Sequence, residues 1–303
     1  MKLKIYTPVI TVFKEDDTFD LEGNIRMMNY LADRGVDGIV PLGSTGEYPS
    51  IPMRQKRDYL DEYIDAAEGK TELLVGSGGV NPKETVSLSN HILKKGRRCV
   101  KGVLVISEFY YHMDGEDFYR YYSWMAEQIE GPVYLYNYPQ RTGSSIPPKT
   151  VERLAARYPN ISGLKDSVTD FSHTEEVLQR VLPVRPDFQV FSGYDSQVLM
   201  NRDKGGAGGI GALSNLVPEL AAGLIKAANE NDSQGEARAM ERIQGLMELY
   251  TLCSNPQKLF KELLRYRGVD ISARCLFPFD AISAEALGRG KEILETYGLK
   301  GAR

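Results

Sequence analysis

The sequence predicts a closed (β/α)8 barrel that carries a C-terminal helical appendage. Eight short β-rich runs recur between residues 5 and 211, and most of the segments between them have the apolar spacing of amphipathic helices. Strands that alternate with helices form parallel βα units, and eight such units close a barrel. A length of 303 residues suits one such barrel with an addition.

The eight runs are short, as parallel strands buried on both faces usually are. Leu21, Ile25 and Met28 have helical spacing after the first run, and Asn81-Pro82 marks the start of a later helix. The predicted strands are Ile5–Phe13, Gly38–Leu42, Leu73–Gly76, Lys101–Ile106, Val133–Tyr136, Ile161–Lys165, Phe188–Phe191 and Ala207–Gly211.

An open doubly wound sheet is the alternative arrangement of the same elements. It predicts a glycine fingerprint after the first strand, where the chain has Thr7-Pro8. Gly206-x-Gly208-x-x-Gly211 matches a dinucleotide fingerprint in form, but it occurs late and outside a strand-turn-helix context. Close backbone approach near a site, or a sugar-phosphate site at the last two strands, explains these glycines better.

From about Asn231 the β-rich runs stop. Residues 1–230 are therefore predicted to form the barrel with the active site, and residues 231–303 a helical domain that packs on it. No low-complexity linker separates the two. The predicted helices of the appendage run from Gln234 to Cys253, from Pro256 to Tyr266 and from Ala284 to Tyr297.

The composition excludes several classes of function. With 42% hydrophobic and 26% charged residues the chain is typical of a globular protein, and its net charge of -4 argues against nucleic-acid or membrane partners. The N-terminus lacks a signal-peptide apolar region, and the three histidines are scattered, which argues against a metal site. A cytoplasmic location is expected, because the cysteines lie too far apart for a disulfide framework: Cys99, Cys253 and Cys275.

One lysine ends the sixth predicted strand. The segment Asn160–Ser167 is an apolar run that closes with Lys165 and Asp166. Lys165 taken alone is either a solvated residue on the barrel rim or a Schiff-base nucleophile. A partly desolvated ammonium loses proton affinity, so its free amine can attack a ketone near neutral pH.

Other candidate residues follow the ends of neighbouring strands, where barrel active sites form. Gly43–Glu47 holds two hydroxyls between glycines and suits either a carboxylate site or a capped turn. Tyr136, beside Lys165, is either a proton shuttle or a core residue. Arg141 can bind a second carboxylate or form a surface ion pair. Tyr110 lies in an aromatic loop that also suits packing or subunit contacts.

Taken together, these motifs resemble the pyruvate-dependent class I aldolases, the family that includes dihydrodipicolinate synthase, N-acetylneuraminate lyase and the 2-keto-3-deoxy sugar-acid aldolases. The resemblance extends over nearly the whole chain. The motifs that carry it are Gly43-Ser44-Thr45-Gly46-Glu47, Tyr136-Asn137-x-Pro139-x-Arg141-Thr142-Gly143 and Gly163-x-Lys165-Asp166.

The resemblance implies a role for each matching residue. Lys165 is expected to form an imine with the keto carbon of pyruvate, and Tyr136 to shuttle the proton. Ser44 and Thr45 would hold the carboxylate or relay protons, and Tyr110 would complete the relay, from a neighbouring subunit if the protein is oligomeric. The implied substrate-binding residues are Thr45, Arg141, Gly193, Asp195 and Ile210.

The resemblance also implies no metal and no cofactor beyond the covalent imine. The expected partners are small molecules, namely pyruvate with an aldehyde or a keto-deoxy acid. A homo-oligomer is expected, either a dimer or a tetramer.

Two activities of the family remain open. Arg141 slightly favours the 4-hydroxy-tetrahydrodipicolinate synthase reaction, in which it would bind the carboxylate of aspartate semialdehyde. Ser44, Glu108 and Tyr194 depart from the synthase pattern of Thr, Pro and Asp. The Ser44-Thr45 pair and Gly193-Tyr194-Asp195 look more like the lyase or the sugar-acid aldolases. An N-acetylneuraminate lyase is disfavoured, because its Glu and Ser are replaced at Ser196 and Ala212.

Two further alternatives would not use the imine. A small-molecule sensor that kept the pocket would be expected to lose Lys165 or Tyr136, and both are present. A sugar-phosphate enzyme would instead use the glycines near residue 208. Trapping of a pyruvate imine on Lys165 would distinguish these alternatives from an aldolase.

Overall fold

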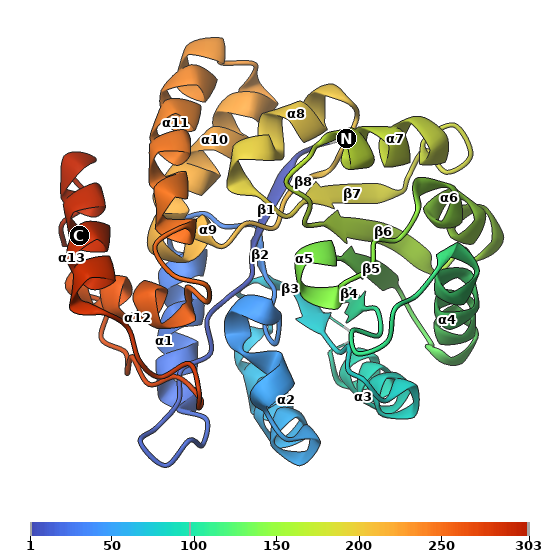
Figure 1. Cartoon of the computed structure of the whole chain (residues 1–303), viewed down its shortest axis with the longest axis horizontal. Helices are drawn as coiled ribbons and strands as arrows, with labels where there is room; N and C mark the ends of the chain where they lie inside the picture. The colour runs from blue at the N-terminus through green and yellow to red at the C-terminus, as the bar shows by residue number, and fades with distance from the viewer. Residues whose placement is uncertain (1, 97, 302–303) are drawn as a thin grey trace.

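The predicted barrel is confirmed. The computed structural model describes residues 2–96 and 98–301, and within them parallel strands close a barrel in chain order, with β8 paired to β1 (Figure 1). The strands are β1 Lys4–Thr7, β2 Gly38–Ile39, β3 Glu72–Gly76, β4 Val100–Ile106, β5 Val133–Asn137, β6 Ile161–Asp166, β7 Gln189–Ser192 and β8 Gly208–Gly209.

Helices follow the strands and form the outer layer of the barrel (Figure 1). Asn81 caps one of them by accepting from the N–H groups of Lys83 and Glu84, with Pro82 at its first position, as the sequence predicts. The helices are α1 Leu21–Ala32, α2 Met53–Ala67, α3 Pro82–Lys95, α4 Gly115–Gln128, α6 Pro148–Arg157, α7 Ser172–Val181, α8 Val198–Asp203 and α10 Pro218–Glu230. Single turns lie at the strand ends: η1 Ser44–Gly46, η2 Tyr48–Ser50, α5 Pro139–Thr142, η3 Asp195–Gln197 and α9 Leu213–Leu216.

The register of the central strands determines which side chains are neighbours at the barrel mouth. Tyr136 of β5 pairs with Lys165 of β6, and Asn137 pairs with Asp166. Alternate residues of a strand point to opposite sides. The phenol of Tyr136 and the amine of Lys165 therefore lie on one side, and the side chains of Asn137 and Asp166 on the other.

The first predicted strand, Ile5–Phe13, is too long. The strand ends at Thr7 because Pro8 has no N–H to donate to a neighbouring strand. Beyond it the backbone N–H of Ile10 donates to Asn215 Oδ1, which lies far along the chain. Residues 9–13 are buried, as their apolar character indicates, but they belong to no strand and only Phe13 forms an isolated bridge, with Phe19.

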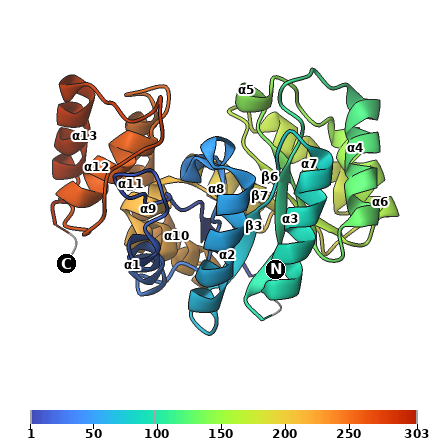
Figure 2. The ribbon, with the colours of Figure 1, turned by 90° about the horizontal axis from the view of Figure 1, so that it is seen from below.

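The C-terminal appendage consists of α11 Ser233–Leu246, η4 Met247–Tyr250, α12 Gln257–Tyr266 and α13 Ala284–Thr296. In Figure 2, α12 and α13 stand beside α9, α11 and α1 at one side of the molecule. The predicted helix from Gln234 to Cys253 was too long, because α11 ends at Leu246 and a 3₁₀ turn follows. The other two helices match their predictions closely. A division into two domains at residue 230 stays a prediction.

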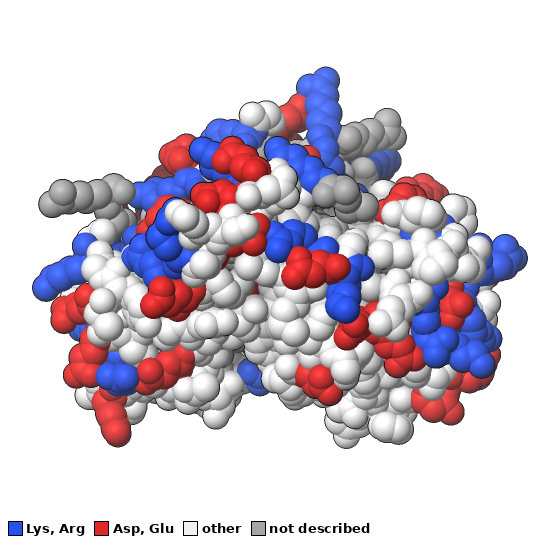
Figure 3. Space-filling model, turned by 90° about the horizontal axis from the view of Figure 1, so that it is seen from above, with Lys and Arg blue, Asp and Glu red and all other residues white. Residues whose placement is uncertain are grey.

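The surface carries charges of both signs. On the face seen in Figure 3, lysine and arginine side chains alternate with aspartates and glutamates. None of the helices in the described part of the chain is long and apolar enough to span a membrane.

Candidate active site

A cavity of about 790 Å³, including open solvent at its mouth, lies at the C-terminal ends of the strands. This is the end at which (β/α)8 enzymes place their active sites. Residues predicted for the site from five different strand ends meet there, although they are far apart in the sequence. They are Ser44, Thr45, Tyr136, Arg141, Lys165, Gly193 and Ile210.

The amine of Lys165 is the buried basic group of this cavity. The residue is 4% exposed, and within the described residues its Nζ has no hydrogen bond or ion pair. The Nζ lies 4.4 Å from the centre of the Tyr136 ring. Burial lowers the pKa of Lys165 to about 8, against smaller opposite effects of Tyr138 and Asp195. About a tenth of the amine is therefore uncharged at pH 7, far more than for a lysine of ordinary pKa.

Tyr136 lies beside this amine with its hydroxyl directed at the loop after β2. Its Oη is 3.3 Å from Ser44 Oγ. Burial raises the pKa of Tyr136, while hydrogen bonds with Ser44 and Ser167 lower it. The phenol is thus protonated and hydrogen-bonded to a second hydroxyl, an arrangement that can pass a proton in either direction.

A buried network lies behind Lys165 and supports the strand ends. Asp166 accepts from Asn137 Nδ2, Thr174 Oγ1 and His173 Nδ1, each at 2.8 Å. Burial alone would lower the pKa of His173, but its contacts with Asp166 raise it above its ordinary value. These contacts occupy the carboxylate of Asp166, and strand alternation turns it away from the amine of Lys165. Asn137 and His173 were not among the predicted site residues.

Arg141 reaches across the cavity mouth to the appendage. Its two terminal nitrogens donate to Asn255 Oδ1 at 3.0 Å and to the carbonyl of Ser254 at 2.9 Å. It makes no ion pair with another described residue. Two of its five N–H groups are used in this way, and the rest remain for a ligand.

Asp195 lies behind the wall of the cavity and does not line it. Its Oδ2 accepts from the hydroxyl of Tyr250 at 2.8 Å, and burial raises its pKa to about 6. That hydroxyl also accepts from the backbone N–H of Ala212 and Leu213. Asp195 therefore fixes Tyr250, which does line the cavity.

Gly193 lies where two strand ends approach closely. A Cβ at this position would lie 2.0 Å from Ser167 Oγ. Gly208 also lies at a close approach, because a Cβ there would lie 1.9 Å from the carbonyl oxygen of Lys4. In addition, its φ of +130° is one that residues with a side chain rarely adopt. The glycines of the last two strands thus permit close backbone packing, as the sequence suggested.

Tyr110 lies away from the cavity of its own chain. It is 78% exposed and packs edge-on against Tyr111, with ring centres 5.1 Å apart. Glu108 Oε1 accepts from the backbone N–H groups of both tyrosines and holds the turn. A catalytic role for Tyr110 therefore requires a second subunit and stays a prediction.

One wall of the cavity comes from the appendage, which the sequence did not reveal. These residues follow α11 and lie far from the strands in the sequence, so no local pattern associates them with the strand ends. They are Tyr250, Ser254, Pro256 and Gln257. Tyr138, Ser167 and Tyr194 are further lining residues that were not predicted. No group of three or more potential metal ligands occurs among residues 2–96 and 98–301.

Comparisons with known proteins give a consistent result. Residues 1–297 match the model of the dihydrodipicolinate synthetase family. A probable 2-dehydro-3-deoxy-D-pentonate aldolase of Escherichia coli K12, YjhH, is 31% identical over 295 residues, 97% of this chain and 97% of the relative. A 4-hydroxy-tetrahydrodipicolinate synthase of Kosmotoga olearia is 31% identical over 248 residues, 82% of this chain and 83% of the relative.

A solved structure agrees with these relatives. YagE of E. coli K12, determined in complex with pyruvate, superposes with a TM-score of 0.94 at 29% identity, over 98% of this chain and 99% of YagE. The family model covers nearly the whole chain, and the relatives are aligned over most of their length. The protein is therefore an enzyme of the lyase class and belongs to the dihydrodipicolinate synthetase family of pyruvate aldolases.

Proposed function

We propose that the protein is a class I aldolase in which Lys165 forms an imine with pyruvate. The observation that carries this proposal is the buried amine of Lys165, which has a pKa of about 8 and no anionic partner within the described residues. It lies at the end of β6 and lines the cavity. A neutral amine at this position attacks a keto group without prior deprotonation by another residue.

The proposed reaction balances with these residues alone. The amine of Lys165 attacks C2 of pyruvate, and the hydroxyl of the adduct leaves as water with a proton from Tyr136, so that the iminium forms. The iminium withdraws electrons, so a C3 proton departs through Tyr136 and Ser44 and an enamine remains. The enamine carbon bonds to the carbonyl carbon of an aldehyde, whose oxygen takes up a proton. Water then hydrolyses the imine and frees Lys165, and the reverse sequence cleaves the product.

For the second substrate we favour a hydroxylated aldehyde, so that the product is a 2-keto-3-deoxy sugar acid. YjhH, similar over nearly its whole length, carries the name of such an aldolase. The appendage wall also presents polar atoms suited to hydroxyl groups. Gln257 Oε1 is buried and accepts no hydrogen bond in the described structure, so a substrate hydroxyl would satisfy an otherwise unpaired acceptor.

Condensation with aspartate semialdehyde is a second candidate, which Arg141 supports. Its guanidinium lines the cavity and keeps unused N–H groups, so it can bind a carboxylate. Arg141→Ala should then raise the KM for aspartate semialdehyde strongly, with little effect on trapping of pyruvate. If the protein does not use that aldehyde, the synthase activity is excluded.

The imine is tested by incubation with pyruvate, reduction with borohydride and peptide mapping by mass spectrometry. We expect a mass gain on the peptide that contains Lys165 and on no other lysine peptide. Absence of that adduct would exclude the proposed mechanism. Pyruvate uptake or release with a panel of hydroxylated aldehydes, aspartate semialdehyde and keto-deoxy acids then identifies the second substrate.

We also propose a homo-oligomer, either a dimer or a tetramer. Tyr110 and Tyr111 form an exposed aromatic pair that a second copy of the chain could cover. Sedimentation of the wild type and of Tyr110→Ala tests this. The cysteines Cys99, Cys253 and Cys275 are free, in line with the cytosolic location that we propose.

A further inference from the structure

Another buried lysine lies in the appendage and forms an ion pair with the loop after β2. Lys261 Nζ, on α12, is 2.5 Å from Glu47 Oε1, and the two side chains are 0% and 1% exposed. The proposed imine chemistry does not use either residue. Glu47 directly follows the turn η1, which holds Ser44 and Thr45.

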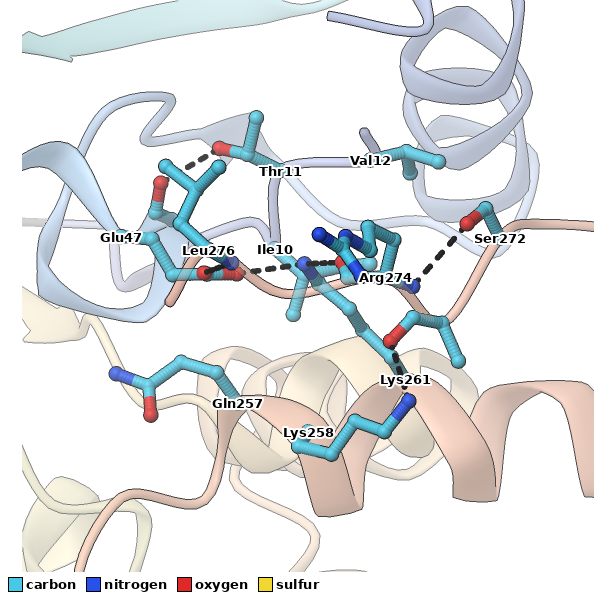
Figure 4. Close-up of polar contacts among 12 residues, drawn as sticks. Ile10, Thr11, Val12, Glu47, Gln257, Lys258, Lys261, Ser272, Arg274 and Leu276 are labelled. Atoms are coloured by element: carbon cyan, nitrogen blue, oxygen red, sulfur yellow. Dashed lines mark hydrogen bonds and ion pairs between the residues drawn. The ribbon is translucent and has the colours of Figure 1, made fainter. Parts of the chain in front are cut away.

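The pair has further hydrogen bonds on both sides. Lys261 Nζ also donates to the carbonyl of Arg274 at 2.6 Å. Glu47 Oε2 accepts from the backbone N–H of Leu276 at 2.8 Å. Figure 4 shows the lysine extending from α12 to the glutamate, with Arg274 and Leu276 beside it. The charges are thus paired and hydrogen-bonded, which a buried ion pair needs to be tolerated.

The same helix contacts the loop at a second position. Gln257, one turn before Lys261 and on the same face of α12, donates from Nε2 to the carbonyl of Ser44 at 3.2 Å. On the other side, Thr11 Oγ1 donates to the carbonyl of Gly46 at 2.8 Å. The loop that carries the Ser44 hydroxyl is therefore held along its length, and two of its contacts come from α12.

The backbone of Glu47 shows why the loop needs this support. Its φ of 60° lies in the left-handed region, where a residue with a side chain is disfavoured. The conformation turns the Glu47 carboxylate towards Lys261 and away from the cavity. Without the ammonium the carboxylate would be left buried and unpaired, and the loop would have to rearrange to reach water.

We infer that Lys261 is a positioning residue for the proposed proton relay, and that α12 sets the place of Ser44 through Glu47. This inference rests on the proposed function, in which Ser44 and Tyr136 move the C3 proton of pyruvate. It gives the appendage a part in the chemical step itself, beyond its contribution to the cavity wall.

The test separates imine formation from proton transfer. In D2O the enamine exchanges the methyl protons of pyruvate for deuterons without any second substrate, and NMR follows that exchange. In Lys261→Met we expect the exchange rate to fall by about tenfold or more, since small misplacements of catalytic groups have effects of this size. The amount of borohydride-trapped imine on Lys165 should stay unchanged.

Arg267→Met is the matched control. Arg267 caps the C-terminal end of the same helix and pairs with Glu219 of α10 at 2.7 Å, away from the site. The Arg267→Met substitution should destabilise the protein without changing the rate of pyruvate methyl exchange per folded molecule. The double variant Glu47→Gln with Lys261→Met removes both charges and keeps the fold testable if the single variant unfolds. It too should exchange slowly.

The outcomes distinguish this inference from the proposed function. If the wild type traps no pyruvate on Lys165, the proposed function itself fails. If the wild type traps and exchanges while the folded double variant exchanges equally fast, Lys261 only stabilises the fold and the inference is wrong. An equal loss of exchange in Arg267→Met would likewise overturn it, because any weakening of α12 would then suffice.

Discussion

Two of the buried lysines, Lys165 and Lys261, have opposite surroundings. Lys261 has the Glu47 carboxylate 2.5 Å from its Nζ, whereas Lys165 faces the ring of Tyr136 and has no anion within bonding distance among the described residues. Desolvation disfavours an ammonium at both places, but Lys261 has a carboxylate in direct contact, whereas Asp195 acts on Lys165 only as a smaller opposing effect. Burial alone therefore does not produce a reactive amine. The absence of a nearby carboxylate is equally necessary.

The sequence neighbour of Lys165 makes this contrast sharper. Asp166 follows it directly, yet strand alternation turns the carboxylate to the opposite side, where Asn137, His173 and Thr174 donate to it. An aspartate one residue further along would point towards the amine and stabilise its charge. The strand thus carries a carboxylate next to the lysine in sequence while keeping it away in space.

The largest expected effect comes from removing the unpaired lysine. Lys165→Met should abolish imine formation and lower turnover by about 10⁴-fold or more, as loss of a nucleophile does. Mass mapping after pyruvate and borohydride should find no adduct in this variant, and in the wild type none on the Lys261 peptide. An adduct on Lys261 would refute the comparison.

Tyr136→Phe tests the other group beside Lys165. It keeps the ring that covers the amine and removes the hydroxyl, so trapping should persist while turnover falls by about 10²- to 10⁴-fold. Methyl exchange of pyruvate in D2O is the direct measurement. Wild-type exchange in this variant would show that another group accepts the proton.

Replacing Lys261, which is paired with Glu47, should lower the stability of the protein more than replacing Lys165, which has no such partner. Lys261→Met leaves Glu47 buried without its partner and should cost about 3 to 5 kcal/mol of unfolding free energy. The double variant with Glu47→Gln should recover much of that loss. Lys165→Met should cost little, because it removes a charge whose burial is not compensated. Urea unfolding of the variants measures all three, and equal losses at the two lysines would contradict the comparison.

The pH dependence gives the smallest but most specific effect. The rate of imine trapping should rise with pH and level off above about 8, the pKa of Lys165, since only the free amine attacks. Asp195 raises that pKa slightly through its charge. Asp195→Asn should therefore move the midpoint to lower pH by a fraction of a unit. A shift to higher pH would mean that the carboxylate does not act on the amine.

The free energy of unfolding should also depend on pH through the ionisation of Lys165, and the lowered pKa determines the direction of that dependence. The pKa of Lys165 is lowered from 10.5 to about 8 in the folded protein. Between these values the unfolded chain binds more protons than the folded one, so the contribution of Lys165 to stability rises with pH. Below pH 8 the full cost of burying the ammonium remains. Lys165→Met lacks this dependence, so between pH 8 and 10.5 the wild type should gain stability relative to the variant.

The barrel and its strand-end residues were predictable because both depend on local patterns. Buried parallel strands are apolar throughout, and the residue after each strand lies at the same end of the barrel. The error at residues 9–13 has a physical reason. Those residues are as apolar as a strand, but the N–H groups of Ile10 and Val12 donate to the side chains of Asn215 and Asn24, and no local pattern reveals such partners.

The contribution of the appendage was not predictable for a similar reason. Helical periodicity continues past Leu246, so the break into the 3₁₀ turn Met247–Tyr250 is not visible in the sequence. That turn directs Tyr250 to Asp195. Lys261 and Gln257 likewise appear as ordinary residues of an amphipathic helix until the fold brings them against Ser44 and Glu47.

The wall supplied by the appendage also bears on how the enzyme is made. A ribosome completes β6 and Lys165 well before it reaches Tyr250 and Lys261. Until that last segment folds, the cavity lacks the wall that contains Tyr250 and Gln257, and the loop with Ser44 lacks its contacts with α12. The proposed site is therefore complete only after the ribosome has passed Lys261.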